Sequence, residues 1–221
     1  MEFAPSQPVP IFPLPNVVLF PRTVIPLHVF ELRYRTMVRD ALSGQRMLTL
    51  AVLKPGWERD YHVSPPFHDL GCLARIETVE WLPNDCYDLQ VVGLSRVRIG
   101  RLSREYPYRA ARVAPLPQAP LSEDDPLVQL ERRALVNACQ RWAELPARPG
   151  EVVPAREFDA ELPYETLVNS ICTGLAADPE ERLELLALDR LTDRGRRVRE
   201  WVERRLRAKS PPAPPTGGEW N

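Results

Sequence analysis

The apolar and polar positions change their period inside the first segment of the chain, Val9 to Leu42. Up to residue 28 a helix is excluded, because proline fixes φ, lacks an N–H and pushes the preceding residue toward extended geometry. Such prolines stand at 10, 13, 15, 21 and 26. The β-forming residues between them predict two extended runs, with the prolines at edges, bulges or strand ends. From Val29 onward the apolar residues follow the spacing of one helix face, which consists of Phe30, Tyr34, Met37, Val38, Ala41 and Leu42.

We expect this helix to be buried between a β-sheet and helices near the C-terminus. On that placement Phe30 is a core residue, and its replacement by alanine should cost about 3 to 5 kcal/mol. The opposite face is polar and carries Glu31, Arg33 and Arg35. Two interpretations of this polar face stay open: a solvated surface with i,i+4 pairs such as Glu31 with Arg35, or a contact surface for a partner.

Further along, short apolar runs and alternating stretches predict more strands. Met47–Leu53 is a compact apolar run typical of a buried strand. Residues 71–82 alternate, with a parity slip between Leu73 and Ile76 that indicates a bulge, and the turn residues 83–85 lead into a second alternating run. Two more strands are expected at 97–102 and 108–113. With one helix and no βαβ repeat, these strands favour an antiparallel sheet that closes into a small barrel.

Between two of these strands, Lys54 to Leu70 shows no periodicity and is expected to be a long loop. Loops of this length are uncommon unless they are functional or disordered. This one is unusually rich in aromatic residues: Trp57, Tyr61 and Phe67 stand beside His62 and His68. The rings either pack back onto the barrel or face a ligand.

After the proline-rich stretch 115–120, strands give way to helices. Asp125 and Pro126 open the first, whose stripe is expected to be Leu127, Leu130, Ala134, Ala138 and Trp142. Pro163 opens the second, Asp178 with Glu181 forms a capping box for the third, and a fourth starts near residue 192. The expected organisation is a disordered N-terminus 1–8, a barrel domain 9–116, a helical domain 117–209 and a disordered tail 210–221.

Composition narrows the class of protein. The 221 residues are 44% hydrophobic and 27% charged with a net charge of -1, which is ordinary for a globular protein and gives no global field to recruit nucleic acid. The start lacks the charged opening of a secretory signal, and no run approaches the roughly 18 apolar residues of a membrane span. We therefore expect a cytoplasmic protein. The scattered Cys72, Cys86, Cys139 and Cys172 predict buried, reduced thiols and no metal site.

Specific motifs in the opening segment resemble a known family, the N-terminal substrate-binding domain of Lon-type ATP-dependent proteases, which also occurs as a stand-alone bacterial protein and in cereblon. The family pattern P-L-F-P-L, L-F-P, P-L and F-E-x-R-Y is matched by residues 10–14, 19–21, 26–27 and 30–34. A later G-x-x-R-x-x-I element is matched by Gly93, Arg96 and Ile99. The sequence departs from the family at Arg22, where glycine is frequent, and at the hairpin tip 83–86, which replaces an Asp-Gly.

The family's catalytic parts are not found in this sequence. A phosphate-binding loop needs a lysine after a glycine, and the only two lysines, Lys54 and Lys209, do not follow one. Neither lysine suits a Ser/Lys peptidase dyad. His28, His62 and His68 form no metal-ligand or triad spacing. We expect no enzyme activity, no catalytic residues, no cofactor and no metal.

The resemblance implies an α+β fold: a PUA-like antiparallel β pseudo-barrel with one packed helix, followed by a C-terminal α-helical bundle. It also implies a non-catalytic module whose partners are unfolded or exposed protein segments and a separate protease or chaperone. The partner-binding candidates are Trp57, Tyr61, Phe67, Glu31, Arg33 and Arg35. Two alternatives remain: a nucleic-acid binder, since PUA-like folds also bind RNA and residues 190–209 are basic, and a small-molecule sensor of the cereblon type, whose zinc-binding domain has no counterpart here.

Overall fold

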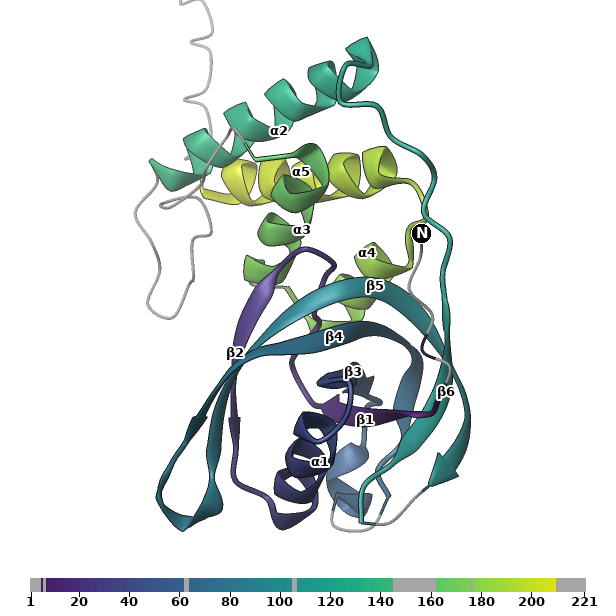
Figure 1. The fold of residues 1–221 in the computed structure, drawn as a ribbon. Helices are drawn as coiled ribbons and strands as arrows, with labels where there is room; N and C mark the ends of the chain where they lie inside the picture. Colours follow the sequence, from purple (N-terminus) through teal and green to yellow (C-terminus); the bar gives the residue numbers. More distant parts are fainter. Residues whose placement is uncertain are drawn as a thin grey trace, which may run out of the picture.

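The computed structural model describes residues 5, 7–61, 64–104, 107–144, 162–175 and 177–209. The predicted disordered tail 210–221, most of the predicted disordered N-terminus 1–8 and residues 145–161 between the first two C-terminal helices lie outside these residues. The described chain has mixed α and β content, with the sheet at one end and four of the five α-helices at the other (Figure 1).

The sheet closes on itself as a ring. Its strand order is β2-β5-β4-β3-β1-β6, and β5 also pairs with β6, so five strands form the ring and β2 extends from β5. The strands are β1 (Val9–Leu14), β2 (Val24–Val29), β3 (Met47–Leu53), β4 (Phe67–Trp81), β5 (Tyr87–Arg104) and β6 (Ala110–Pro115). The expected purely antiparallel sheet is wrong at one pair, because β1 and β3 run parallel. A parallel pair needs a long crossover, which β2 and the first helix supply.

Two of the predicted strands are parts of one continuous strand. The runs at 87–91 and 97–102 belong to the single 18-residue strand β5, which pairs with β2 through its first part and with β6 through its last. The register against β4 shifts between Leu73 and Ala74, which places a bulge where one was expected, but the extra residue, Leu94, belongs to β5 and not to β4. Only glycine fits at position 93 in this part of β5, because a Cβ there would be 2.2 Å from the Phe20 carbonyl oxygen. The segment 17–20 is therefore buried against the sheet without forming the expected strand.

Two departures from the family pattern occupy left-handed backbone. Arg22 has φ 65°, and Asn84 and Asp85 at the β4–β5 hairpin tip have φ 63° and 60°. Glycine adopts this conformation without a steric cost, and asparagine and aspartate tolerate it better than most residues. The unusual residues therefore keep the backbone geometry that glycine would give.

The first helix, α1 (Leu32–Leu42), packs its Tyr34, Met37, Val38 and Ala41 against the inner side of the sheet. The prediction that these residues lie between the sheet and the C-terminal helices is wrong, since α1 is at the end of the ring away from those helices (Figure 1). The prediction for Phe30 is also wrong, because this side chain is 61% exposed. Phe30 precedes the helix and continues the alternation of β2, in which Val29 points inward.

The C-terminal helices share a core with the nearby face of the sheet. Buried residues of α2 (Pro126–Ala143), α3 (Tyr164–Gly174), α4 (Pro179–Ala187) and α5 (Leu191–Lys209) join Val18, Phe20 and Val52 in one cluster. Asp125 caps α2 as predicted, accepting from the Leu127 amide at 2.9 Å. The predicted stripe is wrong at its start, since Leu127 and Leu130 are 68% and 56% exposed and Val128 is buried instead. Asp178 occupies the N-cap position of α4 without the expected side-chain hydrogen bond.

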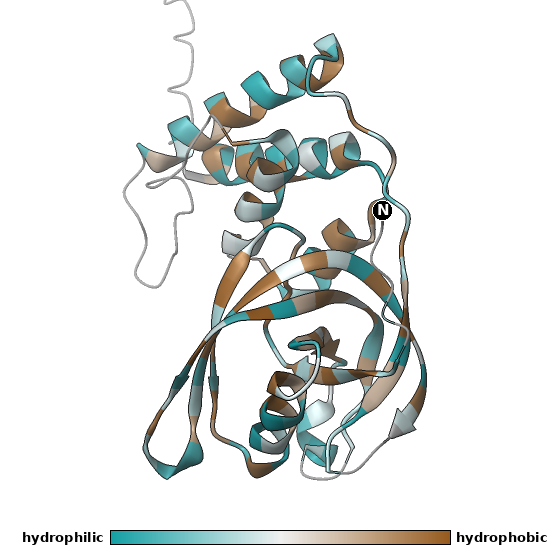
Figure 2. Cartoon of the chain, in the orientation of Figure 1, coloured by the Kyte–Doolittle hydropathy of each residue, from teal (hydrophilic) through white to brown (hydrophobic). Residues whose placement is uncertain are grey.

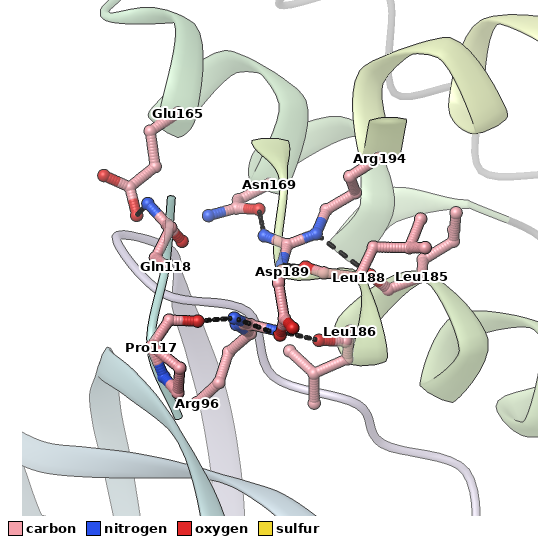
Figure 3. A network of polar contacts seen from close by, with 10 residues as sticks. All are labelled: Arg96, Pro117, Gln118, Glu165, Asn169, Leu185, Leu186, Leu188, Asp189 and Arg194. Carbon is pink, nitrogen blue, oxygen red and sulfur yellow. Dashed lines mark hydrogen bonds and ion pairs between the residues drawn. The ribbon is translucent and has the colours of Figure 1, made fainter. Parts of the chain in front are cut away.

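Two fully buried arginines lie where these helices meet the sheet (Figure 3). Arg96 of β5 donates to the carbonyls of Leu186 at 3.0 Å and Pro117 at 2.6 Å, and pairs with Asp189 at 3.1 Å. Arg194 of α5 donates to the carbonyls of Leu185 and Leu188 and to the Asn169 side-chain oxygen, at 2.7 to 2.9 Å. Asn169 in turn donates to the Pro21 carbonyl at 2.9 Å. Burial lowers the pKa of Arg194, and its three acceptors offset part of the cost of keeping the charge inside.

We predict that Met37→Ala destabilises the protein by about 2 to 5 kcal/mol, because it removes a fully buried side chain from the core under the sheet. Phe30→Ala is the matched control and should change the free energy of unfolding by less than about 1 kcal/mol, since most of that ring is in water. Urea denaturation of both variants measures the difference. Equal losses would contradict this assignment of inward and outward residues.

We also predict that Arg194→Lys costs about 2 to 4 kcal/mol in unfolding free energy, because an ammonium cannot reach all three acceptors of the planar guanidinium. Arg197→Lys on the same helix is the control, as that side chain is 58% exposed. It should stay within about 0.5 kcal/mol of the parent. If the same denaturation shows no change in unfolding free energy for Arg194→Lys, the hydrogen bonds of the planar guanidinium are dispensable for stability.

Candidate functional site

The aromatic loop is shorter than its sequence suggests. It spans residues 54–66, because Phe67 and His68 already belong to β4. Its base is closed by a hydrogen bond from the Lys54 amide to the Pro66 carbonyl at 2.9 Å. Gly56, with φ 82°, turns the chain into a short 3-10 helix, Trp57–Asp60. His62 lies outside the described residues.

Four of the six predicted binding residues meet where this loop reaches the start of α1. Tyr61 donates its hydroxyl to one carboxylate oxygen of Glu31, and Arg33 donates to the other through Nε at 3.0 Å. The Arg33 guanidinium lies 5.1 Å from the Tyr61 ring centroid, and Trp57 packs edge-on against Tyr61 at 5.2 Å. All four side chains are half-buried. We call Glu31, Arg33, Trp57 and Tyr61 the loop–helix cluster.

The cluster continues inward through Tyr34, a residue of the predicted helix face, and through Arg109, which the sequence did not single out. Arg33 also lies over the Tyr34 ring at 4.6 Å, and Tyr34 accepts a hydrogen bond from Arg109. Arg109 in turn donates to the Pro65 carbonyl at 2.6 Å and lies 4.6 Å from the centre of the Phe67 ring. Phe67 is therefore held at the far end of this series of rings and guanidinium groups. In the sequence, Arg109 shows only as one polar position in a strand, so no local signal marks it.

Arg35 is placed apart from the cluster. The expected i,i+4 pair with Glu31 is wrong, because Glu31 is satisfied by Tyr61 and Arg33. Arg35 instead donates to the Asn84 carbonyl at the tip of the β4–β5 hairpin. That contact links α1 to the hairpin and leaves the loop–helix cluster with one cation and one carboxylate.

The ionisation of Tyr61 is tied to this geometry. Burial raises the pKa of Tyr61 to about 12, and the hydrogen bond to the Glu31 carboxylate adds to the shift in the same direction. The hydroxyl is thus a proton donor at neutral pH and holds Glu31 toward the loop. A neutral phenol, a paired carboxylate and two rings packed edge to face form a surface suited to contact.

The remaining histidines and cysteines are placed in separate structural contacts. His28 and His68 pair with Asp88 and Glu180 at 2.6 and 2.9 Å, on different elements. Cys72, Cys139 and Cys172 are buried, and burial raises the pKa of each thiol to about 12, while Cys86 is half-buried. Among the described residues no three His, Cys, Asp or Glu side chains are grouped to hold a metal. No described helix is both long and apolar enough to cross a membrane.

Comparison with known proteins gives one consistent match. The sequence profile of the ATP-dependent protease La (LON) substrate-binding domain matches residues 8–204. Lon protease 2 of Myxococcus xanthus is 30% identical over 66% of this chain and 18% of its own length. Lon protease of Anaeromyxobacter dehalogenans is 26% identical over 89% of the chain and 23% of its own length. The chain therefore spans about a fifth of the length of these relatives.

Solved structures show the same fold. The N-terminal domain of a Mycobacterium avium complex Lon protease matches with a TM-score of 0.62 at 17% identity, over 89% of this chain and 98% of that one. A Lon N-terminal domain protein from Xanthomonas campestris matches with a TM-score of 0.58 at 24% identity, over 88% and 98%.

We predict that the stabilising contribution of Tyr61 depends on pH. Its folded pKa, about 12, lies above the ordinary value of 10, so the contribution is fully present below about pH 10 and is lost as pH rises through 12. Tyr61→Phe should therefore cost more unfolding free energy at pH 8.5 than at pH 11, by urea denaturation. Glu31→Gln, as a control, should shrink this difference because it removes the carboxylate that favours the protonated phenol. A cost that is the same at both pH values would rule out the raised pKa.

Proposed function

We propose that this chain, which belongs to the family of the ATP-dependent protease La (Lon) substrate-binding domain, is a non-catalytic module that recognises unfolded or exposed segments of other proteins. The observation that carries the proposal is the loop–helix cluster. It presents half-buried rings beside one guanidinium and one carboxylate at the end of the ring that the C-terminal helices leave uncovered. Large rings with few rotatable bonds are what peptide-binding surfaces use.

We further propose that the ring-shaped sheet is a PUA-like pseudo-barrel, that the C-terminal helices form a bundle, and that the boundary between the two domains lies near residue 116. The module works in the cytoplasm without catalysis, and the segments it binds are clients of a protease or chaperone.

The nucleic-acid alternative is weakened by the pairing of the basic helix α5. Three of its arginines form ion pairs with neighbouring acids: Arg196 with Asp193, Arg197 with Glu200, and Arg199 with Glu131 and Glu203. Arg194 is fully buried. A phosphate backbone is bound through unpaired surface cations, so much of the charge counted in the sequence is already used within the protein.

The proposed binding role predicts that removing one ring of the loop–helix cluster lowers the affinity for an unfolded protein. Trp57→Ala should weaken binding of fluorescein-labelled, reduced and carboxymethylated α-lactalbumin at least about tenfold, because truncating a hot-spot ring costs about 2 kcal/mol or more and about 1.4 kcal/mol corresponds to a factor of ten. The melting temperature should change little, since Trp57 is only half-buried. Leu127→Ala, an exposed apolar truncation on α2, is the control and should bind as the parent does.

Fluorescence anisotropy and a melting curve on the same samples separate the two interpretations of the loop. If Trp57→Ala lowers stability and binding together, the loop is a cover for the sheet. If the parent protein fails to bind the unfolded protein at all, the proposed function is wrong.

A further inference from the structure

Strand β2 has one free side. Among the strands that the structure describes, every other one has neighbours on both sides, whereas β2 pairs only with β5, from Val24 to Val29. In Figure 1 it descends along the side of the ring toward α1. An unpaired strand edge exposes backbone donors and acceptors that can pair with another chain.

The backbone groups on that free side can be identified. The Gly93 amide donates to the Thr23 carbonyl at 2.9 Å, so Thr23 and then every second residue, Ile25, Leu27 and Val29, face β5. The intervening residues, Val24, Pro26 and His28, direct their backbone groups outward. Because proline lacks an N–H, the free side offers two amides, those of Val24 and His28, together with the carbonyls of all three.

Apolar side chains accompany this edge. Side chains two residues apart share a face of a strand, which places Val24, Pro26, His28 and Phe30 in one outward row. Val24 is 54% and Phe30 61% exposed, Leu32 just beyond is 65% exposed, and the His28 and Phe30 rings stack at 5.9 Å. Figure 2 shows hydrophobic residues at the turn from β2 into α1. A contiguous exposed apolar row beside an open edge is typical of an interaction site.

The face next to the row is acidic. A hollow of about 610 Å³ lies over β2, β5 and β4, and it is lined by Glu80 and Asp88 with no lysine or arginine among its lining residues. Glu80 and Asp88 are cross-strand partners, so two carboxylates face each other. The His28 ring pairs with Asp88 at 2.6 Å and leaves Glu80 to a partner. Charge complementarity therefore favours a partner with a lysine or arginine.

We propose that β2 accepts an extended peptide segment as an added strand, and that the preferred segment carries a basic residue between apolar ones. The apolar side chains lie on Val24 and Phe30, and the basic side chain crosses the compact Pro26 to reach Asp88 and Glu80. An added strand lies roughly 10 Å from β5, within reach of a long cation and a carboxylate together. This inference rests on the proposed function and names the class of segment that is bound.

The test uses a fluorescein-labelled ten-residue peptide that alternates valine with threonine and has two arginines at its centre. We expect it to bind the full chain at least tenfold more tightly than a peptide with glutamates in place of the arginines. N-methylation of one alternate set of peptide amides should abolish binding, whereas methylation of the other set should leave it unchanged, because only one edge of an added strand faces β2. Equal binding of both methylated peptides would overturn strand addition.

A pair of variants tests the same edge from the protein side. His28→Pro removes an outward amide and should weaken the peptide at least tenfold, whereas His28→Thr keeps the amide and should bind within threefold of the parent. The methylated peptides remain decisive if His28→Pro fails to fold. A dimer in sedimentation that His28→Pro dissociates would instead assign the edge to a second copy and overturn the proposal.

Failure of the β2 inference can be distinguished from failure of the proposed function. If the carboxymethylated α-lactalbumin binds the parent and a folded His28→Pro equally, the β2 inference is wrong while substrate recognition stands. If neither the unfolded protein nor the arginine peptide binds, both fail.

Discussion

Two guanidinium groups that have no contact with bulk water decide how the two ends of this molecule are arranged. Arg96 and Arg194 donate to four main-chain carbonyls from residues 117 and 185–188, and Arg194 also engages Asn169. A buried charge is tolerated only when its donors are satisfied. The corner between α4 and α5 must therefore sit where both forks can reach it, which fixes the helices on one face of the sheet (Figure 3).

That attachment leaves the other end of the ring uncovered by the C-terminal helices. α1 fills the interior there, and its polar start, the aromatic loop and the β4–β5 hairpin surround it. The loop–helix cluster lies at this end, and β2 runs down to it from the side of the C-terminal helices (Figure 1). A rigid scaffold with contact residues on its rim is a common arrangement for binding proteins, and here the scaffold's hydrophobic core is complete without those rim residues.

Much of the local structure could be predicted from the sequence, because it depends on short-range rules. The extended backbone around the prolines follows from steric limits on φ. The buried run of β3 and the bulge near Leu73 follow from the period of the apolar residues. The Asp125 cap needs only a side chain that reaches the start of its own helix. The errors occurred where one residue changes the period. Phe30 fits a helix face by spacing, yet it follows the alternation of β2 and points outward. Leu127 and Leu130 fit a stripe, yet the contact with α5 selects Val128.

The same distinction between local and long-range determinants applies to the candidate site. The sequence by itself determined the family, the elements and which segments were unusually aromatic or charged, since composition and motifs are local properties. Only the tertiary structure decided that Tyr61 and Arg33 share Glu31, that Arg35 turns to the hairpin and that Arg109 connects Tyr34 to Phe67. It also decided that Arg96 and Arg194 are buried and that β2 ends the sheet. These contacts join residues far apart in the chain, and their geometry is set by strand pairing and packing, which no local pattern encodes.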